Sequence, residues 1–186
     1  PSNSSAASDV YKRQYKQLWV VSLDFMDVET QKKLIVYVKR GGHLIIMPTL
    51  PDKDINLNKC KLLYNEFGIV RKSVEYPYPP KIDLLDVKDF LGLARVNIYE
   101  EGDGSEVIAR TSDGKCCGLR RKIGKGNLTL LGTGFNYELE EHLKAYKRLL
   151  EADELNQYTY SANQDLITGQ IFAEDYSYLY ILNYHR

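Results

Sequence analysis

This 186-residue sequence lacks several features that would each indicate a class of protein. No apolar run approaches the roughly 20 residues that cross a bilayer as a helix, so we expect no membrane span. Neither sign of charge is in excess, because 25 Lys and Arg balance 25 Asp and Glu. Nucleic-acid binders normally carry a basic excess, so the composition argues against that class as well.

Cysteine and histidine are also scarce. The three cysteines are Cys60, Cys116 and Cys117, an odd number without the spacing of a metal site. Free thiols are typical of a reducing compartment, which favours the cytoplasm, although the sequence does not fix the localisation. The three histidines are far apart and lack acidic residues at ligand spacing, so we predict no metal site.

The segment from Leu18 to Pro48 is the most informative part of the chain. Its short apolar run at Leu18–Val21 predicts a buried strand. Asp27 is a suitable helix N-cap, and apolar residues at helical spacing follow it until Gly41 and Gly42 end the helix. A second buried strand is predicted at His43–Met47. Two such strands joined by one helix should be parallel, which predicts an α/β core.

The remainder alternates helical and strand patterns. Residues 57–67 predict a helix that stops at Gly68, and 69–76 predict a strand. Short strands separated by turn signals then predict an antiparallel insertion over 96–119. An apolar strand at 127–132 should return to the main sheet, and 139–150 has the spacing of an amphipathic helix.

The two ends of the chain differ from the middle. Residues 1–14 have no hydrophobic period, and we interpret them as a non-native or disordered leader. The α/β domain is assigned to 15–155 and is expected to be N-terminally truncated. From 156 to 186 strand patterns return, which predicts the beginning of a C-terminal β-sandwich-type domain. These strands are predicted at 158–160, 167–172 and 178–182.

Several acidic groups lie close together in sequence, and none is assigned a catalytic role. Asp24 lies near Asp27, and Asp52 near Asp54. Asp27 is explained as a helix cap. A third group lies at the start of a helix, where the helix dipole favours acids: Glu138, Glu140 and Glu141. A glycosidase pair needs a cleft and a separation of about 5–10 Å, which adjacency in sequence does not supply.

No other reactive constellation is predicted. A cysteine nucleophile usually lies at a strand-to-helix elbow, and none of the three thiols does. Gly124-x-Gly126 lacks the third glycine of a phosphate-binding loop and precedes a strand, so it is predicted to be a turn. The Tyr-Pro-rich stretch at 76–80 is consistent with an extended linker or a sugar-stacking surface. We therefore assign no catalytic, cofactor-binding or metal-binding residue.

Some of these patterns resemble a known family. The series Leu18-Trp19-Val20-Val21, then Asp27 and Gln31, then 37–45 (YVKRGGHLI), resembles the trimerisation domain of microbial β-galactosidases. This glutamine-amidotransferase-like domain occurs in glycoside hydrolase families 42 and 35. Residues 48–51, 124–126 and 130–133 also fit its pattern, and 178–184 resembles the opening of the small β-domain that follows it.

The resemblance implies a fold and a function. The fold is a flavodoxin-like, class I glutamine-amidotransferase-like parallel sheet with helices on both faces and an antiparallel insertion. The function is that of a non-catalytic accessory and oligomerisation domain of a β-galactosidase-like glycoside hydrolase. Its partners are an upstream catalytic barrel in the same polypeptide and further copies of the chain, and galactoside is bound only through the parent enzyme.

Two other functions remain open from the sequence. One is an active amidotransferase-like cysteine hydrolase that uses Cys60 or Cys116. The other is a carbohydrate-binding module that uses the tyrosine-rich C-terminal part, since 15 tyrosines is an unusual number and many lie there.

Overall fold

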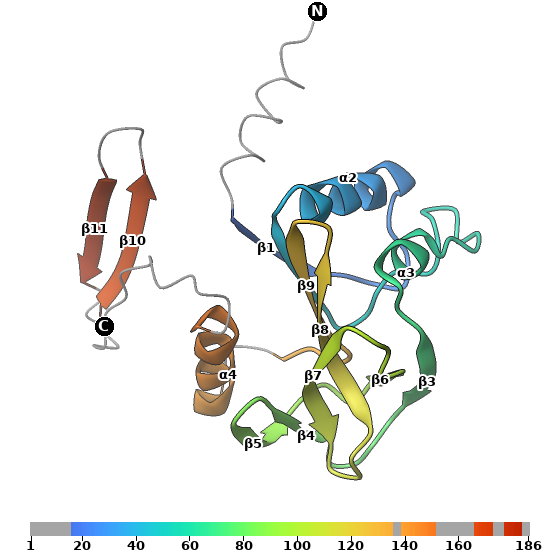
Figure 1. Cartoon of the computed structure of the whole chain (residues 1–186). Coiled ribbons are helices and arrows are strands. Elements are labelled where there is room, and N and C mark those ends of the chain that lie inside the picture. Colours follow the sequence, from blue (N-terminus) through green and yellow to red (C-terminus); the bar gives the residue numbers. More distant parts are fainter. Residues whose placement is uncertain (1–15, 136–138, 152–165, 173–176, 184–186) are drawn as a thin grey trace, which may run out of the picture. The chain divides into compact units, whose positions relative to one another are not determined.

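The structure is a computed structural model that describes residues 16–135, 139–151, 166–172 and 177–183 (Figure 1). The chain divides into two compact units, Pro1–His142 and Leu143–Arg186, which are considered separately below. The predicted leader at 1–14 and the predicted strand at 158–160 lie outside the described residues.

The predicted strand–helix–strand element is confirmed. Strand β1 covers Gln17–Val21, helix α2 covers Val28–Lys39, and strand β2 covers His43–Met47. The Asp27 carboxylate accepts a hydrogen bond from the Thr30 backbone N–H at 2.9 Å, as expected of an N-cap. β1 and β2 are parallel, and every side chain of β2 is buried.

Strands β1 and β2 form one end of a seven-stranded sheet. Its order is β1-β2-β9-β8-β7-β4-β5, and only the β1–β2 and β2–β9 pairs are parallel. The other five strands follow later in the chain: β4 (Lys81–Leu84), β5 (Val87–Leu91), β7 (Ser105–Thr111), β8 (Cys116–Ile123) and β9 (Gly126–Leu131). The predicted return of 127–132 to the main sheet is confirmed, because β9 lies between β2 and β8.

The predicted fold class is wrong. A flavodoxin-like or amidotransferase-like domain would have a parallel sheet with helices on both faces, whereas this sheet is mixed and mostly antiparallel. The described residues contain three helices and eleven strands. The reason lies in the connections: after β2 the chain forms one short helix and then hairpins, so the β-α-β pattern that builds a parallel sheet does not recur.

A short helix and a small second sheet follow β2. Helix α3 covers Leu62–Phe67 and ends at Gly68, which has the left-handed backbone (φ +63°) predicted for a helix stop. The helix begins later than expected, because 54–60 form a loop. Strand β3 (Arg71–Glu75) pairs with β6 (Val96–Tyr99) in antiparallel orientation.

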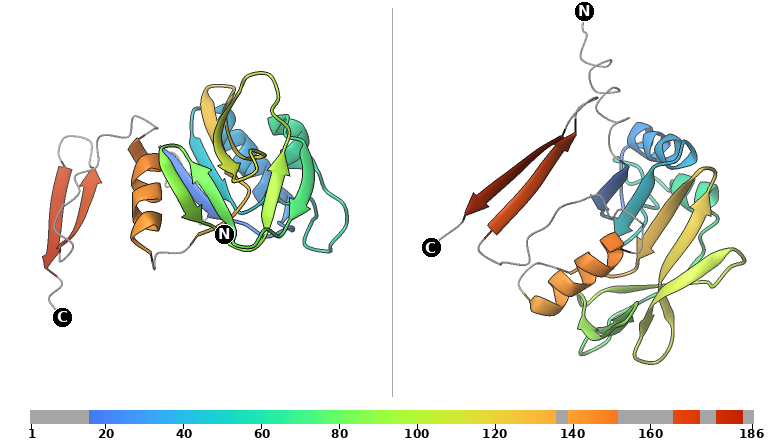
Figure 2. Two further views of the ribbon diagram at one scale, coloured as in Figure 1. Left: turned by 90° about the horizontal axis from the view of Figure 1, so that it is seen from below. Right: turned by 60° about the vertical axis from the view of Figure 1, so that its left-hand side comes forward.

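The main core lies between the sheet and its two helices. Figure 2 shows α2 and α3 together on one side of the sheet. Buried side chains from these helices and from β2 and β9 form one cluster: Leu34, Ile35, Val38, Leu44, Ile46, Leu63, Phe67, Leu128 and Leu130. Burying a side chain of this size contributes about 1.5–3 kcal/mol, so this face is the main source of stability for the unit.

Helix α4 (Glu140–Glu151) begins in the first unit and continues into the second. The second unit also contains a hairpin of β10 (Leu166–Phe172) and β11 (Ser177–Asn183), which confirms the strands predicted at 167–172 and 178–182. That 156–186 begin a β-sandwich-type domain stays a prediction. No helix among the described residues is long and apolar enough to cross a membrane.

Substitution of Gly126 tests how the last turn of α2 is held against the sheet. A Cβ at this position would overlap the carbonyl oxygens of Val38 and Gly42, which are backbone atoms and cannot rotate away. We expect Gly126→Ala to lower the free energy of unfolding by about 1–3 kcal/mol, measured by urea denaturation. Gly102→Ala is the matched control, since its Cβ meets only a side-chain nitrogen of Arg121 at 3.8 Å. Equal stability of the two variants would contradict this packing.

Candidate functional site

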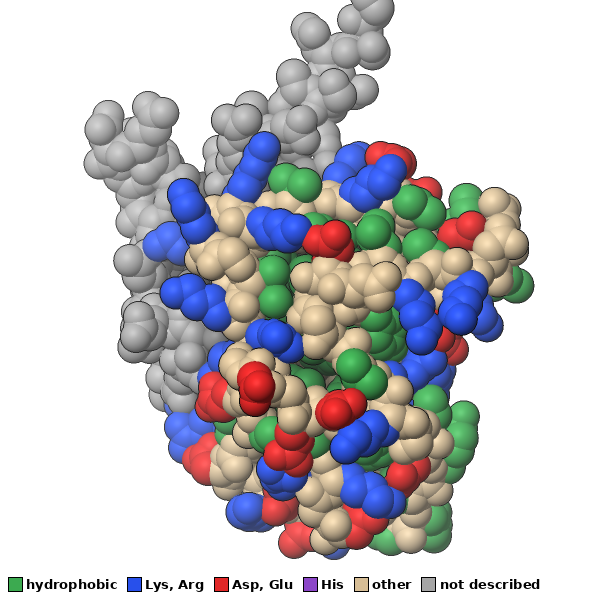
Figure 3. All heavy atoms as spheres, turned by 45° about the vertical axis from the view of Figure 1, so that its right-hand side comes forward, with side chains coloured by type: hydrophobic (Ala, Val, Ile, Leu, Met, Phe, Trp, Pro, Cys, Tyr) green, Lys and Arg blue, Asp and Glu red, His purple; other side chains and the backbone are tan. Residues whose placement is uncertain are grey.

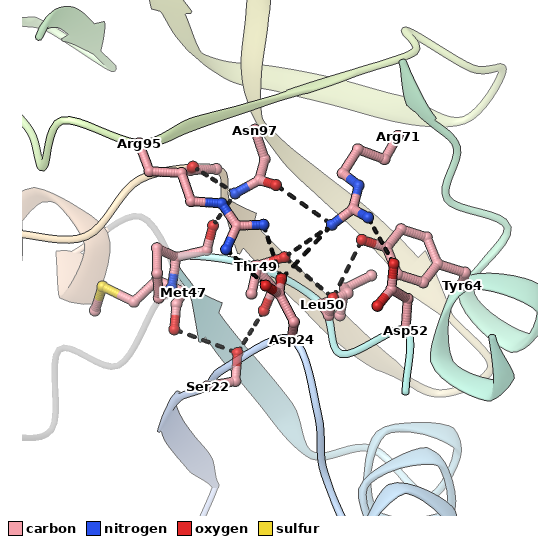
Figure 4. Close-up of polar contacts among 12 residues, drawn as sticks. Ser22, Asp24, Met47, Thr49, Leu50, Asp52, Tyr64, Arg71, Arg95 and Asn97 are labelled. Atoms are coloured by element: carbon pink, nitrogen blue, oxygen red, sulfur yellow. Dashed lines mark hydrogen bonds and ion pairs between the residues drawn. The ribbon is translucent and has the colours of Figure 1, made fainter. Parts of the chain in front are cut away.

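The carboxyl ends of the parallel strands β1, β2 and β9 meet at one edge of the sheet. Ligands of open α/β sheets commonly bind at such an edge, so it is the first place to look for chemistry. A group of charged and amide side chains lies there, and Figure 4 shows how they converge. We call this group the polar cluster: Asp24, Asp52, Arg71, Arg95 and Asn97.

Asp24 and Arg95 form the best-aligned ion pair of the polar cluster. Both guanidinium Nη atoms donate to the two carboxylate oxygens, each at 2.8 Å. These bonds hold the pKa of Asp24 below its usual value, although partial burial opposes the shift. The same bonds raise the pKa of Arg95. Asp24 is therefore an anion throughout the neutral pH range.

Arg71 is the centre of the polar cluster. Its Nη2 lies 2.6 Å from an Asp52 carboxylate oxygen, and its Nη1 lies 3.9 Å from Asp24. The Nη1 atom also donates to Thr49 Oγ1 and to Asn97 Oδ1, both at 3.5 Å. One side chain from β3 thus connects the loops that follow β1 and β2 (Figure 4).

The guanidinium of Arg71 is also positioned from the side by an aromatic ring. It lies over the ring of Tyr64 in α3, 5.7 Å from the ring centroid. The Tyr64 hydroxyl donates to the Leu50 carbonyl at 3.1 Å. These contacts fix the orientation of Arg71.

Asn97 and Ser22 satisfy the backbone at the same edge. The Asn97 amide donates to the carbonyls of Pro48 at 2.9 Å and Gly132 at 3.1 Å, which joins the ends of β2 and β9. The Ser22 hydroxyl donates to the Thr49 carbonyl. Loops at a sheet edge leave backbone groups without ladder partners, and these two side chains provide partners for three of them.

The polar cluster is electrically self-compensated. Two carboxylates face two guanidinium groups: both oxygens of Asp24 accept from Arg95, and one oxygen of Asp52 accepts from Arg71. Tyr99 lies beneath the cluster; burial raises its pKa well above the usual value, so its hydroxyl stays protonated. Within the described residues, no group of three or more metal-binding side chains comes together.

The sequence grouped the carboxylates differently. Asp24 and Asp27 do not act together, because Asp27 caps α2. Asp52 and Asp54 also separate, since Asp54 accepts from the backbone of Asn56 and Asn58 instead. The structure pairs Asp24 with Asp52 across Arg71. Glu138 lies outside the described residues, and Glu140 and Glu141 are in the first turn of α4, as predicted.

The three basic and amide members of the polar cluster were missed by the sequence analysis. Arg71, Arg95 and Asn97 lie in or beside β3 and β6, and no local pattern distinguishes them from surface residues. The sequence contains a partial indication of two of these residues, because Asn97 and Arg71 occupy inward positions of strands that were predicted.

The thiols are buried or held by structural contacts. Cys116 and Cys117 are buried in β8, and burial raises the pKa of both, that of Cys117 to about 12. Cys60 lies in the loop before α3, with its Sγ 3.8 Å from Gln31 Oε1. None of the three is at a strand-to-helix elbow.

Two of the three histidines are in the described residues. His43 Nε2 lies 2.9 Å from Thr129 Oγ1, between β2 and β9. His142 Nε2 lies 2.8 Å from the Leu91 carbonyl, with its ring against Phe90 and Phe135. Both imidazoles are buried and serve packing. His185 lies outside the described residues.

Comparison with known proteins identifies the family. The sequence profile described as "GLMA-like, second domain" matches residues 5–113, more than half of the chain. The chain belongs to the GLMA-like second-domain family. The GLMA-like match includes β1, α2, β2 and all five members of the polar cluster.

Curated relatives of the GLMA-like chain are much longer proteins. It is 36% identical over 173 residues to a β-1,2-glucosyltransferase of Ignavibacterium album, which covers 92% of this chain and 24% of the relative. It is also 36% identical over 161 residues to an exo-β-D-glucosaminidase of Pyrococcus horikoshii, covering 83% of this chain and 20% of the relative. The chain therefore spans about a quarter or less of the relatives it matches.

Solved structures show the same fold inside β-galactosidases. A β-galactosidase from Bacillus circulans sp. alkalophilus matches 92% of this chain with a TM-score of 0.71 at 14% identity. A catalytic mutant of Gan42B, a GH42 β-galactosidase from G. stearothermophilus, matches 91% with a TM-score of 0.69 at 18% identity. The GLMA-like chain covers 27% and 26% of these two proteins. The resemblance to the trimerisation domain of microbial β-galactosidases is confirmed.

Substitution of Asp24 tests the polar cluster through its pH dependence. The folded pKa of Asp24 lies below the unfolded value of about 3.9, so the pair stabilises the fold above that pH. We expect Asp24→Asn to lower the free energy of unfolding at pH 7 by about 1–2 kcal/mol, allowing for solvent screening of a partly exposed pair. The deficit should shrink as the pH falls below 4 and the wild-type carboxylate becomes protonated. Urea denaturation at pH 7, 5 and 3 measures it.

Glu101→Gln provides the matched control for Asp24→Asn. Glu101 also forms a bidentate pair, with Arg110 at 2.6 and 2.9 Å, but the side chains of this pair are more exposed, 49% and 43% against 36% and 32% for Asp24 and Arg95. It should lose less stability at pH 7 than Asp24→Asn. Equal losses, or a deficit for Asp24→Asn that is unchanged at pH 3, would contradict the role of the cluster.

Thiol labelling tests the burial of the cysteines. Because Cys116 and Cys117 are buried with raised pKa values, we expect both to react with a disulfide reagent at pH 8 only after unfolding. Any fast reaction of the native protein should come from Cys60, so the variant Cys60→Ala should show none. A fast phase that survives in Cys60→Ala would indicate an activated thiol in β8.

Proposed function

We propose that this chain is a non-catalytic accessory domain of a larger carbohydrate-active enzyme, of the β-galactosidase-like glycoside hydrolase type. The observation that carries the proposal is the self-compensated polar cluster at the edge of the sheet where a ligand would be expected. The comparisons support the setting, because the matched region is a minor part of enzymes named for glycoside cleavage or glucosyl transfer.

The contacts of the two carboxylates in the polar cluster are unsuited to glycoside cleavage. That reaction needs one carboxylic acid with a raised pKa, which protonates the leaving oxygen, and a second carboxylate across the scissile bond. The pKa of Asp24 is instead lowered, by Arg95. Asp52 is bound to Arg71 at 2.6 Å. Both carboxylates hold loops in place and lack a role in proton transfer.

The contacts of the cluster support an assembly role. Arg71 and Asn97 fasten the loops after β1, β2 and β9 to one another, which gives a rigid surface at one edge of the sheet. A rigid surface is what a domain needs to hold a neighbouring domain or subunit in one orientation. In this proposal the domain packs on the catalytic domain and joins copies of the enzyme into an oligomer.

The two alternative functions gain no support from the described residues. A cysteine hydrolase would need an accessible thiolate, whereas both β8 thiols are buried with raised pKa values. A carbohydrate-binding module was predicted in the tyrosine-rich C-terminal part, whose side chains lie outside the described residues.

Activity of the isolated 186-residue chain tests the proposal. We expect no turnover of 4-nitrophenyl β-galactoside, β-glucoside or β-glucosaminide, because both acids of the polar cluster are bound to arginines. The variants Asp24→Asn and Asp52→Asn are assayed in parallel. If the unsubstituted 186-residue chain shows turnover, and either Asp24→Asn or Asp52→Asn abolishes it, the proposal is refuted.

A further inference from the structure

The end of β1 and the loop that follows it expose a row of apolar side chains. Val21, Leu23 and Phe25 are 81%, 63% and 43% exposed. The two polar residues between them are directed inward: Ser22 is buried and donates to the Thr49 carbonyl, and Asp24 is half-buried and bound to Arg95. The chain bends at Asp24, and along this segment exposed apolar residues alternate with the two inward polar ones.

The loop that follows β2 adds two more apolar side chains. Ile55 and Leu57 are 61% and 62% exposed. In Figure 3 the loop between β2 and α3 protrudes at the upper right, with hydrophobic side chains beside Lys and Arg. Single exposed apolar residues are common, but five on two adjacent loops are typical of an interaction surface.

The two loops are held together by backbone contacts. The Met26 N–H donates to the Lys53 carbonyl at 3.1 Å, and the Lys53 N–H donates to the Asp24 carbonyl at 3.0 Å. The tip of the second loop is closed by Asp54, which accepts from the backbone of Asn56 at 2.8 Å and Asn58 at 2.9 Å. The apolar side chains are therefore presented by ordered backbone, which lowers the entropic cost of binding.

The two loops present more positive than negative charge to solvent. Two of their four acids are paired with arginines, Asp24 with Arg95 and Asp52 with Arg71. Asp27 caps α2, and Asp54, which accepts only from Asn56 and Asn58, keeps its charge at the tip of the second loop. Three lysines are exposed: Lys53, Lys59 and Lys61. The surface that faces outward is thus apolar, with a rim in which lysines outnumber the carboxylate of Asp54.

We propose that this surface packs against the catalytic domain of the same polypeptide, on a surface that is apolar with an acidic rim. We call it the docking patch: Val21, Leu23, Phe25, Ile55 and Leu57, with Lys53, Lys59 and Lys61 around them. The inference rests on the proposed function. It deepens that proposal by naming the surface and the chemistry of its partner.

Two observations favour the catalytic domain over a second copy of the chain as the partner of the docking patch. One is the length of the relatives, and the other is the charge around the patch. The matched region is only 20–24% of the two relatives described above, so a domain of this type has much more polypeptide attached to it than it contains. A two-fold contact between copies would place the same patch on both sides. The lysine rims would then face each other, and like charges across an interface cost several kcal/mol.

The test places this chain in a complete enzyme. The matched 173 residues of the Ignavibacterium album β-1,2-glucosyltransferase are replaced by the corresponding part of this chain. The patch variant carries Leu23→Lys and Leu57→Lys. The control variant carries Val36→Lys and Val70→Lys, which are also exposed but lie outside both loops. Thermal unfolding is followed by calorimetry, for the chimeras and for the isolated 186-residue chain.

The isolated chain should melt at the same temperature with and without the patch substitutions, because these side chains are exposed. The parent and control chimeras should melt in one cooperative step, since docked domains unfold together. The patch chimera should melt in two steps, with the step of this domain falling to the temperature of the isolated chain.

Other outcomes separate the inference from the proposed function. One-step melting of the patch chimera would overturn the docking patch alone. Two-step melting of the parent chimera, or its loss of glucosyltransferase activity, would count against the proposed function and the inference together. Light scattering measures the oligomeric state of the isolated chain and so tests whether a second copy binds the docking patch. If the isolated chain is a dimer and the patch substitutions abolish the dimer, the inference is overturned in favour of a second copy.

Discussion

One arginine holds the carboxyl edge of the sheet together by connecting three segments of the chain. Arg71 in β3 binds Asp52 after β2, lies 3.9 Å from Asp24 after β1, and donates to Asn97 in β6. Loops at the carboxyl edge of a parallel sheet lack ladder partners and are free to vary. The polar cluster removes that freedom. The edge that elsewhere binds ligands is here occupied by the protein's own charges.

Local structure was predictable because its signals are local. The Asp27 cap, the left-handed Gly68 and the parallel β1–β2 pair were all predicted from short patterns and are confirmed. The β4–β5 hairpin was missed because its two-residue turn uses Leu85, at φ +54°, where Asn or Gly is typical. That hairpin extends the sheet beyond β7. It is one part of the error in fold class, because the β7–β8 and β8–β9 pairs are antiparallel as well.

The candidate site was predictable only in part. Its acids, Asp24 and Asp52, stood out because each lies near another acid in the sequence, but their partners in the structure lie 71 and 19 residues away. Ion pairs at such separations depend on which strands become neighbours, and strand order is not written in any short window. The carboxylates could therefore be recognised in the sequence, but the arginines that bind them could not.

The same arrangement explains how a sheet edge can change its use. Ser22 and Asp24 are directed inward, to the Thr49 carbonyl and to Arg95, while their neighbours Leu23 and Phe25 are exposed. The inward polar contacts and the outward apolar side chains thus belong to the same short segment. In such a domain, ion pairs fill the edge of the sheet where a ligand would bind, and a rigid apolar surface lies beside that edge. This combination is expected of a domain that holds another domain in place.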